Sequence, residues 1–328
     1  MAHHHMLTEA DRAHFYELAG LQRISAVNSS TNKVFDVFTF EESSEELLSA
    51  LATNLISPAP TSPPTSPPTP PRTHLNLEII SNHFKYKISP SPSPPQIPST
   101  SQNILIFLHG AGETTPDNNF YKLGVKMNLP NTTILSLLAP HHLPFELGQA
   151  WYHEMDYTTG DQLPNSSSVK ISSLKASIAA IHTFITDVLK PSYSSENMFL
   201  FGFSSGATVA MEVAKTISPR LGGCICVCGG CLLIENASKS KSEKSKTPVL
   251  QFVGGRDAHF RKTVEAKKSQ QLYNGESGKK ESFKLRLMEG KGHEMVGAES
   301  EMKELFVFMG KNLANSTEKM ESMFSKVN

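Results

Sequence analysis

The chain has 328 residues, with basic and acidic side chains equal at 31 each. This balance provides no basic field to bind nucleic acid, while 38% hydrophobic residues are enough to bury a core. No apolar run reaches the roughly 18 residues that a bilayer span requires, so we expect no stable membrane insertion. The first residues lack the basic flank and apolar stretch of a secretory signal, which predicts a cytoplasmic protein.

Residues 1–73 are expected to form an extension that is partly helical and partly proline-rich. Residues 43–56 begin with Ser-Ser-Glu-Glu and continue with leucines at helical spacing, which predicts a short helix. Residues 57–72 are rich in proline, serine and threonine, and this composition predicts a solvated polyproline segment. We interpret it as a linker, with a ligand for SH3- or WW-type domains as the alternative.

The folded domain is expected at 74–315, followed by a C-terminal tail at 316–328. Residues 75–80 and 84–88 alternate apolar and polar side chains, as strands do. A second proline-rich tract at 89–101 follows them. We expect this tract to be a loop inserted in a hairpin of the domain.

From residue 103 onward, strand and helix patterns alternate along the chain. Short apolar runs predict strands, and apolar residues three or four apart predict helices. In chain order we expect strands at 104–108, 134–138, 198–203, 224–228, 249–253 and 283–288, and helices at 171–188, 205–215, 263–273 and 299–312. The alternation predicts an α/β protein with a mostly parallel central sheet and helices on both faces.

All four cysteines lie between positions 224 and 231. Such clustering occurs in metal sites, but strand alternation places Cys224, Cys226 and Cys228 on one face, which suits no tetrahedral site. Cysteine is also among the most frequently buried residue types. We therefore predict a buried strand with reduced thiols, no bound metal and a reducing compartment.

A G-F-S-S-G sequence at 202–206 lies between a predicted strand and a predicted helix. Ser204 would then occupy a tight turn, where glycines avoid collision with the neighbouring strand and helix. A serine hydroxyl is a weak nucleophile that needs a general base, and the base needs an orienting carboxylate. Asp257 and His293 each follow a later predicted strand, in the chain order that sheet hydrolases use. The sequence therefore predicts a catalytic triad of Ser204, Asp257 and His293.

Acyl transfer also needs N–H donors for the developing oxyanion. We assign the backbone N–H of Ser205, which follows the nucleophile, and that of Ala111 in the loop after strand 104–108. His109 precedes Ser204 in the chain and is expected to brace this loop rather than act as the base.

Three further histidines, His141, His142 and His153, are close enough in sequence to suggest a metal site. We interpret the H-H-L-P sequence at 141–144 as part of the rim of the active site instead. Hydrolysis by a serine requires neither a metal nor a cofactor, and we predict none.

These motifs resemble the phospholipase/carboxylesterase/thioesterase family of α/β-hydrolases, which includes the acyl-protein thioesterases. The resemblance covers roughly 103–312 and is carried by F-L-H-G-A-G-E at 107–113, A-P at 139–140, A-W-Y at 150–152, G-F-S-S-G-A at 202–207 and G-K-G-H at 290–293. W-Y-H-E at 151–154 is also similar to related fungal serine hydrolases. The resemblance implies the α/β-hydrolase fold and gives the same roles to the five residues assigned above.

The chain departs from the family pattern at three places. Ser205 stands where the family usually has Gln, but the donated group is backbone, so activity should survive. Glu113 replaces an Asp, and Ala-His-Phe follows Asp257 in place of the family's Pro-x-Val-Pro. The last change removes information about the acyl pocket.

The sequence as a whole predicts a serine hydrolase that cleaves carboxylic esters or thioesters through an acyl-enzyme on Ser204. Its substrate would be a small-molecule or lipid ester or thioester, with an acylated protein among the candidates. Two alternatives stay open: a non-catalytic binding or scaffold protein on the hydrolase fold, and an acyltransferase that uses the same triad.

Overall fold

The computed structural model describes residues 21–27, 34–40, 75, 77–89, 103–233, 245–260, 265–273 and 283–313. Among these residues, no helix combines the length and apolarity that crossing a bilayer demands. The expected helix at 43–56, the proline-rich residues 57–72 and 90–101, and the tail at 316–328 lie outside them. Within the predicted extension, β1 (Leu21–Val27) and β2 (Val34–Phe40) form an antiparallel pair that the sequence did not predict.

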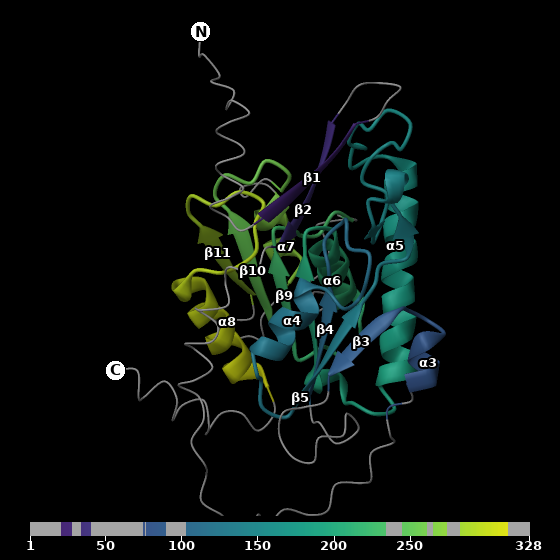
Figure 1. The fold of residues 1–328 in the computed structure, drawn as a ribbon. Helices are drawn as coiled ribbons and strands as arrows, with labels where there is room; N and C mark the ends of the chain where they lie inside the picture. Colours follow the sequence, from purple (N-terminus) through teal and green to yellow (C-terminus); the bar gives the residue numbers. More distant parts are fainter. Residues whose placement is uncertain are drawn as a thin grey trace, which may run out of the picture.

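A seven-stranded sheet forms the centre of the molecule (Figure 1). In spatial order its strands are β11 (Phe283–Met288), β10 (Val249–Gly254), β9 (Gly223–Val227), β8 (Met198–Phe203), β4 (Asn103–Leu108), β5 (Thr132–Leu137) and β3 (Tyr86–Ser89). All neighbouring strands are parallel except β3, which runs antiparallel to β5. The predicted α/β-hydrolase architecture with a mostly parallel sheet is confirmed.

The strands are apolar because both faces of the sheet are covered. Every residue of β4 and β5 is buried, as expected for a central parallel strand. Along β4, Ile104, Ile106 and Leu108 pack on one face, while Leu105 and Phe107 pack on the other. The alternation therefore divides the core into two hydrophobic layers.

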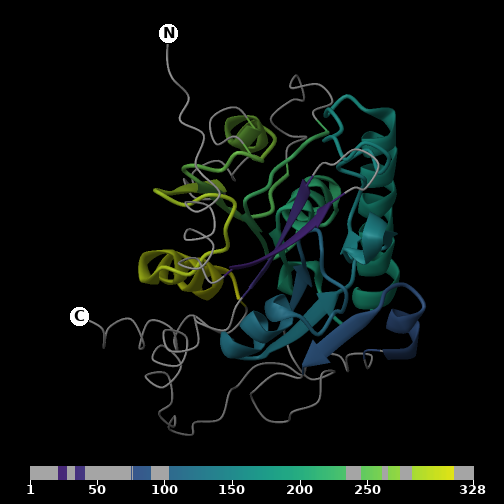
Figure 2. The ribbon, with the colours of Figure 1, turned by 45° about the horizontal axis from the view of Figure 1, so that its top comes forward.

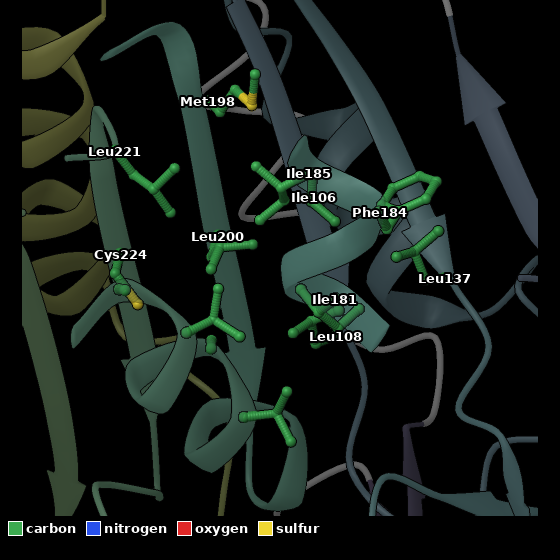
Figure 3. Close-up of a cluster of buried hydrophobic side chains, with 14 of the residues drawn as sticks. Ile106, Leu108, Leu137, Ile181, Phe184, Ile185, Met198, Leu200, Leu221 and Cys224 are labelled. Atoms are coloured by element: carbon green, nitrogen blue, oxygen red, sulfur yellow. The ribbon is translucent and has the colours of Figure 1, made fainter. Parts of the chain in front are cut away.

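One face is covered by α3 (Leu77–Ser81), α5 (Ser168–Thr183) with its π-helical continuation (Phe184–Leu189), and α6 (Ser205–Thr216). Figure 3 shows Ile181 and Phe184 against the strand residues Leu108 and Leu137. The single helix predicted at 171–188 is confirmed, with its last turns wound more loosely than an α-helix.

The opposite face is covered by α4 (Asn119–Lys126) and α8 (Glu299–Asn312) (Figures 1 and 2). Phe107 of β4 and Phe201 of β8 stack there with ring centroids 4.8 Å apart. At the β11 edge of the sheet, α7 (Glu265–Gln271) confirms part of the helix predicted at 263–273. Helix α4 was not predicted from the sequence.

The strand predicted at 75–80 is wrong, because Leu77–Ser81 form the short helix α3. Ile80 and Phe84 are buried, whereas Leu77 and Ile79 are exposed. A spacing of four between the buried residues fits a helix, and Phe84 packs edge-on against Phe184 at 5.5 Å. Apolar alternation alone did not distinguish the two structures.

The second proline-rich tract does not connect the strands of a hairpin. It joins β3 to β4, and these strands are separated in the sheet by β5, which pairs with both. Strand β3 therefore occupies the edge of the sheet, and the hairpin prediction is wrong.

The predicted buried cysteine strand is confirmed, since all four thiols are free and buried. One detail is wrong. Cys224 and Cys226 share one face of β9, but Cys228 packs with Ile225 and Val227 in the opposite layer. Cys228 follows the strand with a left-handed backbone (φ 52°), which breaks the alternation.

Candidate active site

Ser204 lies in the turn between β8 and α6, with φ 52° and ψ −119°. Its N–H donates to the carbonyl of Val227 at 2.9 Å. Glycine is required on both sides, because a Cβ on Gly202 would lie 2.4 Å from the oxygen of Gly206, and one on Gly206 2.1 Å from that of Leu108. The G-x-S-x-G spacing thus produces a strained turn that holds the Ser204 hydroxyl above the sheet.

The three residues predicted to form a triad are brought together by the carboxyl ends of three strands. His293 follows β11 and its Nε2 lies 2.8 Å from Ser204 Oγ. Asp257 follows β10, and its Oδ2 lies 2.9 Å from His293 Nδ1. The donor and acceptor atoms form a continuous chain from carboxylate to imidazole to hydroxyl, which is the arrangement that activates a serine.

The carboxylate of Asp257 is held on both oxygens. Its Oδ1 accepts the backbone N–H groups of His259 at 2.8 Å and Phe260 at 2.9 Å. Burial acts to raise the pKa of Asp257, but the hydrogen bond and charge of His293 and the two backbone donors lower it below the usual value. The group is therefore ionised at neutral pH and accepts a hydrogen bond from the N–H at His293 Nδ1.

His109 braces the loop after β4 and takes no part in the triad. Its Nε2 accepts the N–H of Ala139 at 2.9 Å, and its Nδ1 faces the carbonyl of Gly110 at 2.5 Å. Burial lowers the pKa of this imidazole to about 4, so it is neutral at pH 7. Trp151 Nε1 donates to the carbonyl of His109 at 2.9 Å, which ties the loop to the segment before α5.

The backbone N–H groups assigned to the oxyanion belong to the residue after Ser204 and to the loop that follows the neighbouring strand β4. Ser205 is the first residue of α6, where N–H groups lack a partner within the helix. Ala111 lies in the loop after β4, the strand beside β8. Neither N–H has a hydrogen-bond partner among the residues that the structure describes.

Sequence reasoning missed a small strap that fixes the loop after β4. Strands β6 (His141–His142) and β7 (Gln149–Ala150) pair antiparallel. Gln149 accepts the N–H of Gly112 at 3.0 Å and donates to the carbonyl of Glu113 at 2.8 Å. Two-residue strands carry no periodic signal, so nothing in the sequence distinguished this strap from a rim loop.

A second missed feature is the buried carboxylate of Glu212 on α6. Its Oε1 accepts the N–H groups of Leu232 and Leu233, each at 2.7 Å, and its Oε2 pairs with Lys215. Glu212 is 1% exposed. It anchors the segment after β9, which passes beside the nucleophile turn.

The histidines considered for a metal do not gather into a site with a third donor in the described part of the chain. The rings of His141 and His153 lie 4.8 Å apart, and His142 is exposed. The one group of three suitable donors among the described residues is Cys228, Asp257 and His293, whose ligand atoms lie within 4.8 Å of one another.

Residues 96–313, about two thirds of the chain, match the family described as Phospholipase/Carboxylesterase. An uncharacterized hydrolase of Mycosarcoma maydis is 33% identical over 177 residues, which are 50% of this chain and 59% of that protein. The chain thus spans somewhat over half of that relative. Acyl-protein thioesterase 1 of Kluyveromyces lactis is 26% identical over 168 residues, 48% of this chain and 70% of that one.

Among solved structures, the esterase PE8 superposes with a TM-score of 0.56 at 18% identity. The superposition covers 70% of this chain and 99% of that one, and at this identity it supports the fold alone. The family match includes the loop after β4, the nucleophile turn and the two loops that carry Asp257 and His293. The chain therefore belongs to the phospholipase/carboxylesterase family of hydrolases.

Proposed function

We propose that this hydrolase cleaves carboxylic esters or thioesters through a covalent acyl-enzyme on Ser204. The observation that carries the proposal is the hydrogen-bonded chain from Asp257 through His293 to Ser204, with distances of 2.9 and 2.8 Å. Both contacts are hydrogen-bond distances, and the contact between His293 and Ser204 is short enough for proton transfer.

In the first half of the reaction, His293 Nε2 takes the proton of the Ser204 hydroxyl as Oγ attacks the acyl carbon. Asp257 holds the Nδ1 proton, so that Nε2 presents its lone pair to the serine. The backbone N–H groups of Ala111 and Ser205 donate to the oxygen that becomes negative, and the dipole of α6 adds to this stabilisation. The leaving alcohol or thiol then takes the proton from His293.

In the second half, water enters and loses a proton to His293 as it attacks the acyl carbon. The C–O bond to Ser204 breaks, the serine regains its proton, and the carboxylic acid leaves. Each half of the reaction returns the imidazole to its neutral state. The ionised Asp257 orients this neutral ring through the hydrogen bond to Nδ1.

We propose small-molecule or lipid acyl esters or thioesters as the substrates, with acylated proteins among the candidates, and the cytoplasm as the compartment. The four free, buried thiols of β9 and its following loop are consistent with a reducing compartment.

The direct test is hydrolysis of a chain-length series of p-nitrophenyl esters and the matching thioesters by the full-length protein. We expect an initial burst of p-nitrophenol wherever deacylation is slower than acylation. The ratio of kcat/KM for each ester to that for the matching thioester shows whether the enzyme prefers an alcohol or a thiol leaving group. Hydrolysis that is equally fast in the Ser204→Ala variant would overturn the proposal.

A further inference from the structure

A cysteine thiol lies next to the proposed triad, in the core layer that also contains Met295 and Val296 from the segment after His293. Cys228 is 1% exposed, and its Sγ lies 3.3 Å from the carbonyl of Glu294 and 3.9 Å from that of Gly292. These two residues flank His293. The reaction proposed above has no use for this thiol.

The left-handed backbone at Cys228 places the thiol there. Its N–H still donates to the carbonyl of Phe252 on β10 at 2.9 Å, which continues the ladder between the strands. The side chain, however, points to the face opposite Cys224 and Cys226. Cys228 differs from the other three cysteines in this respect. Its strained backbone directs a thiol, which is a soft metal ligand, towards two other side chains that can bind a metal, Asp257 and His293.

The donor set has the chemistry that Zn²⁺ prefers. A thiolate, an imidazole nitrogen and a carboxylate oxygen are its common ligands, and catalytic zinc sites have three protein ligands with the fourth position held by water. In a tetrahedral site with these bond lengths, ligand atoms lie about 3.3–3.8 Å apart. The donors of Cys228, Asp257 and His293 already lie within 4.8 Å of one another, so side-chain shifts of about an ångström would suffice.

We propose that Cys228, Asp257 and His293 form an inhibitory site for a thiophilic divalent cation such as Zn²⁺. The ion bonds to Sγ, to a carboxylate oxygen and to Nδ1. It releases one proton, from the thiol, while the imidazole proton moves from Nδ1 to Nε2, so that Nε2 can no longer accept a proton from Ser204. The two positive charges of the ion balance the thiolate and the carboxylate, so the buried site, which carries the single negative charge of Asp257 without the ion, becomes neutral. The ion breaks the hydrogen bond between Asp257 and His293, and the imidazole loses its orientation towards Ser204.

Burial and the neighbouring Asp257 raise the pKa of the Cys228 thiol well above its usual value. Without a cation the thiol therefore stays protonated and does not compete with Ser204 as a nucleophile. The site would act only when a cation of sufficient affinity displaces the proton.

The test uses two readouts on the full chain. Cd²⁺ bound to a thiolate produces a ligand-to-metal charge-transfer band in the near ultraviolet, and this band requires no hydrolysis. The histidines at positions 3–5 can also bind divalent ions, but they produce no such band. Zn²⁺ inhibition of ester hydrolysis, reversed by a chelator, is the second readout.

We expect wild type to show one Cd²⁺–thiolate band per chain and to lose activity with Zn²⁺. The Cys228→Ser variant should lose the band, and the Zn²⁺ concentration that halves its activity should rise at least roughly 10–100-fold. Loss of a residue that only supports a metal ligand already lowers metal affinity by that factor. Cys226→Ser is the matched control on the opposite face of β9, and it should keep both responses. Cys228→Ala repeats the test if the serine variant does not fold.

An equal band or equal Zn²⁺ sensitivity in the Cys228 and Cys226 variants would overturn the proposal, as would the absence of a band in wild type. Failure of the hydrolase proposal is distinguishable from this outcome, because the charge-transfer band is measured without any substrate.

Discussion

The ring of His259 lies against the ring of His293, with centroids 5.0 Å apart and planes at 62°. His259 follows Asp257 by two residues, and its Nδ1 lies 3.2 Å from Gln162 Nε2 on the segment before α5. The edge-to-face contact limits rotation of His293, the proposed general base. Through Gln162, it also links the loop after β10 to the segment before α5, and Trp151 of that segment braces the loop after β4.

Loss of this contact should slow the reaction without unfolding the protein. His259 is exposed, and its backbone N–H to Asp257 is retained in His259→Ala. We expect kcat/KM to fall by about 10- to 100-fold, the scale of a misplaced catalytic group. His182→Ala on α5 is the control and should match wild type. A His259→Ala enzyme as fast as wild type would show that the ring contact does not position His293.

Asp257→Asn tests the role of the carboxylate in fixing the imidazole tautomer. The amide can present its NH₂ group to Nδ1, so that Nε2 carries the proton and cannot accept one from Ser204. We expect kcat to fall by roughly 10⁴-fold, the value known for this change in a serine protease triad. Asp117→Asn on the surface is the control. Steady-state kinetics with a p-nitrophenyl ester measure the loss, and a decrease of less than tenfold would contradict the tautomer argument.

Glu113 should make the stability of the protein depend on pH. Burial raises the pKa of Glu113 from 4.5 to about 7, so the folded protein keeps this proton while the unfolded chain loses it. The contribution of Glu113 to the free energy of unfolding is complete below pH 4.5, decreases as the pH rises, and is lost above about pH 7. Over this range the loss amounts to about 3 kcal/mol at most.

The uncharged Glu113→Gln variant should not show this loss. We expect its free energy of unfolding, measured with urea, to increase relative to wild type between pH 5 and pH 8. Glu146→Gln, between β6 and β7, is exposed and serves as the control. A parallel pH dependence of the Glu113→Gln and wild-type proteins would show that the Glu113 carboxyl is not desolvated in solution.

Glu212 should be required for stability although it lies outside the proposed reaction. Glu212→Ala leaves the N–H groups of Leu232 and Leu233 without their acceptor and removes the carboxylate that pairs with Lys215, whose ammonium keeps only the Leu233 carbonyl. Breaking such a buried ion pair costs about 3–5 kcal/mol. The midpoint of denaturant unfolding measures the loss, with exposed Glu299→Ala on α8 as the control. A loss below 1 kcal/mol would show that water replaces the carboxylate.

Much of the site was predictable because its signals are local. A Cβ on Gly202 would collide with the backbone of Gly206 in the turn, and one on Gly206 with that of Leu108 on the neighbouring strand. Asp257 follows the buried strand β10, and His293 follows β11, whose apolar residues alternate with charged ones. Parallel strands then bring their carboxyl ends to one edge, so loops distant in sequence meet without any further information.

Other features depend on tertiary contacts that residue types do not reveal. The alternation at 75–80 fits a strand, yet the edge beside β5 is occupied by β3. Cys228 changes face through one backbone angle, and Glu212 looks like a surface residue of a helix until its partners from the next loop are known. In each case the missing information is the position of a neighbour from another part of the chain.

The central claim is that Ser204 is an activated nucleophile, and reaction with a fluorophosphonate probe tests it most directly. Wild type and the control Ser192→Ala, a buried serine before β8, should both be labelled, and mass spectrometry should locate the adduct on Ser204. Ser204→Ala should not react. Labelling of Ser204→Ala at the wild-type rate, or no labelling of folded wild-type protein, would contradict the account.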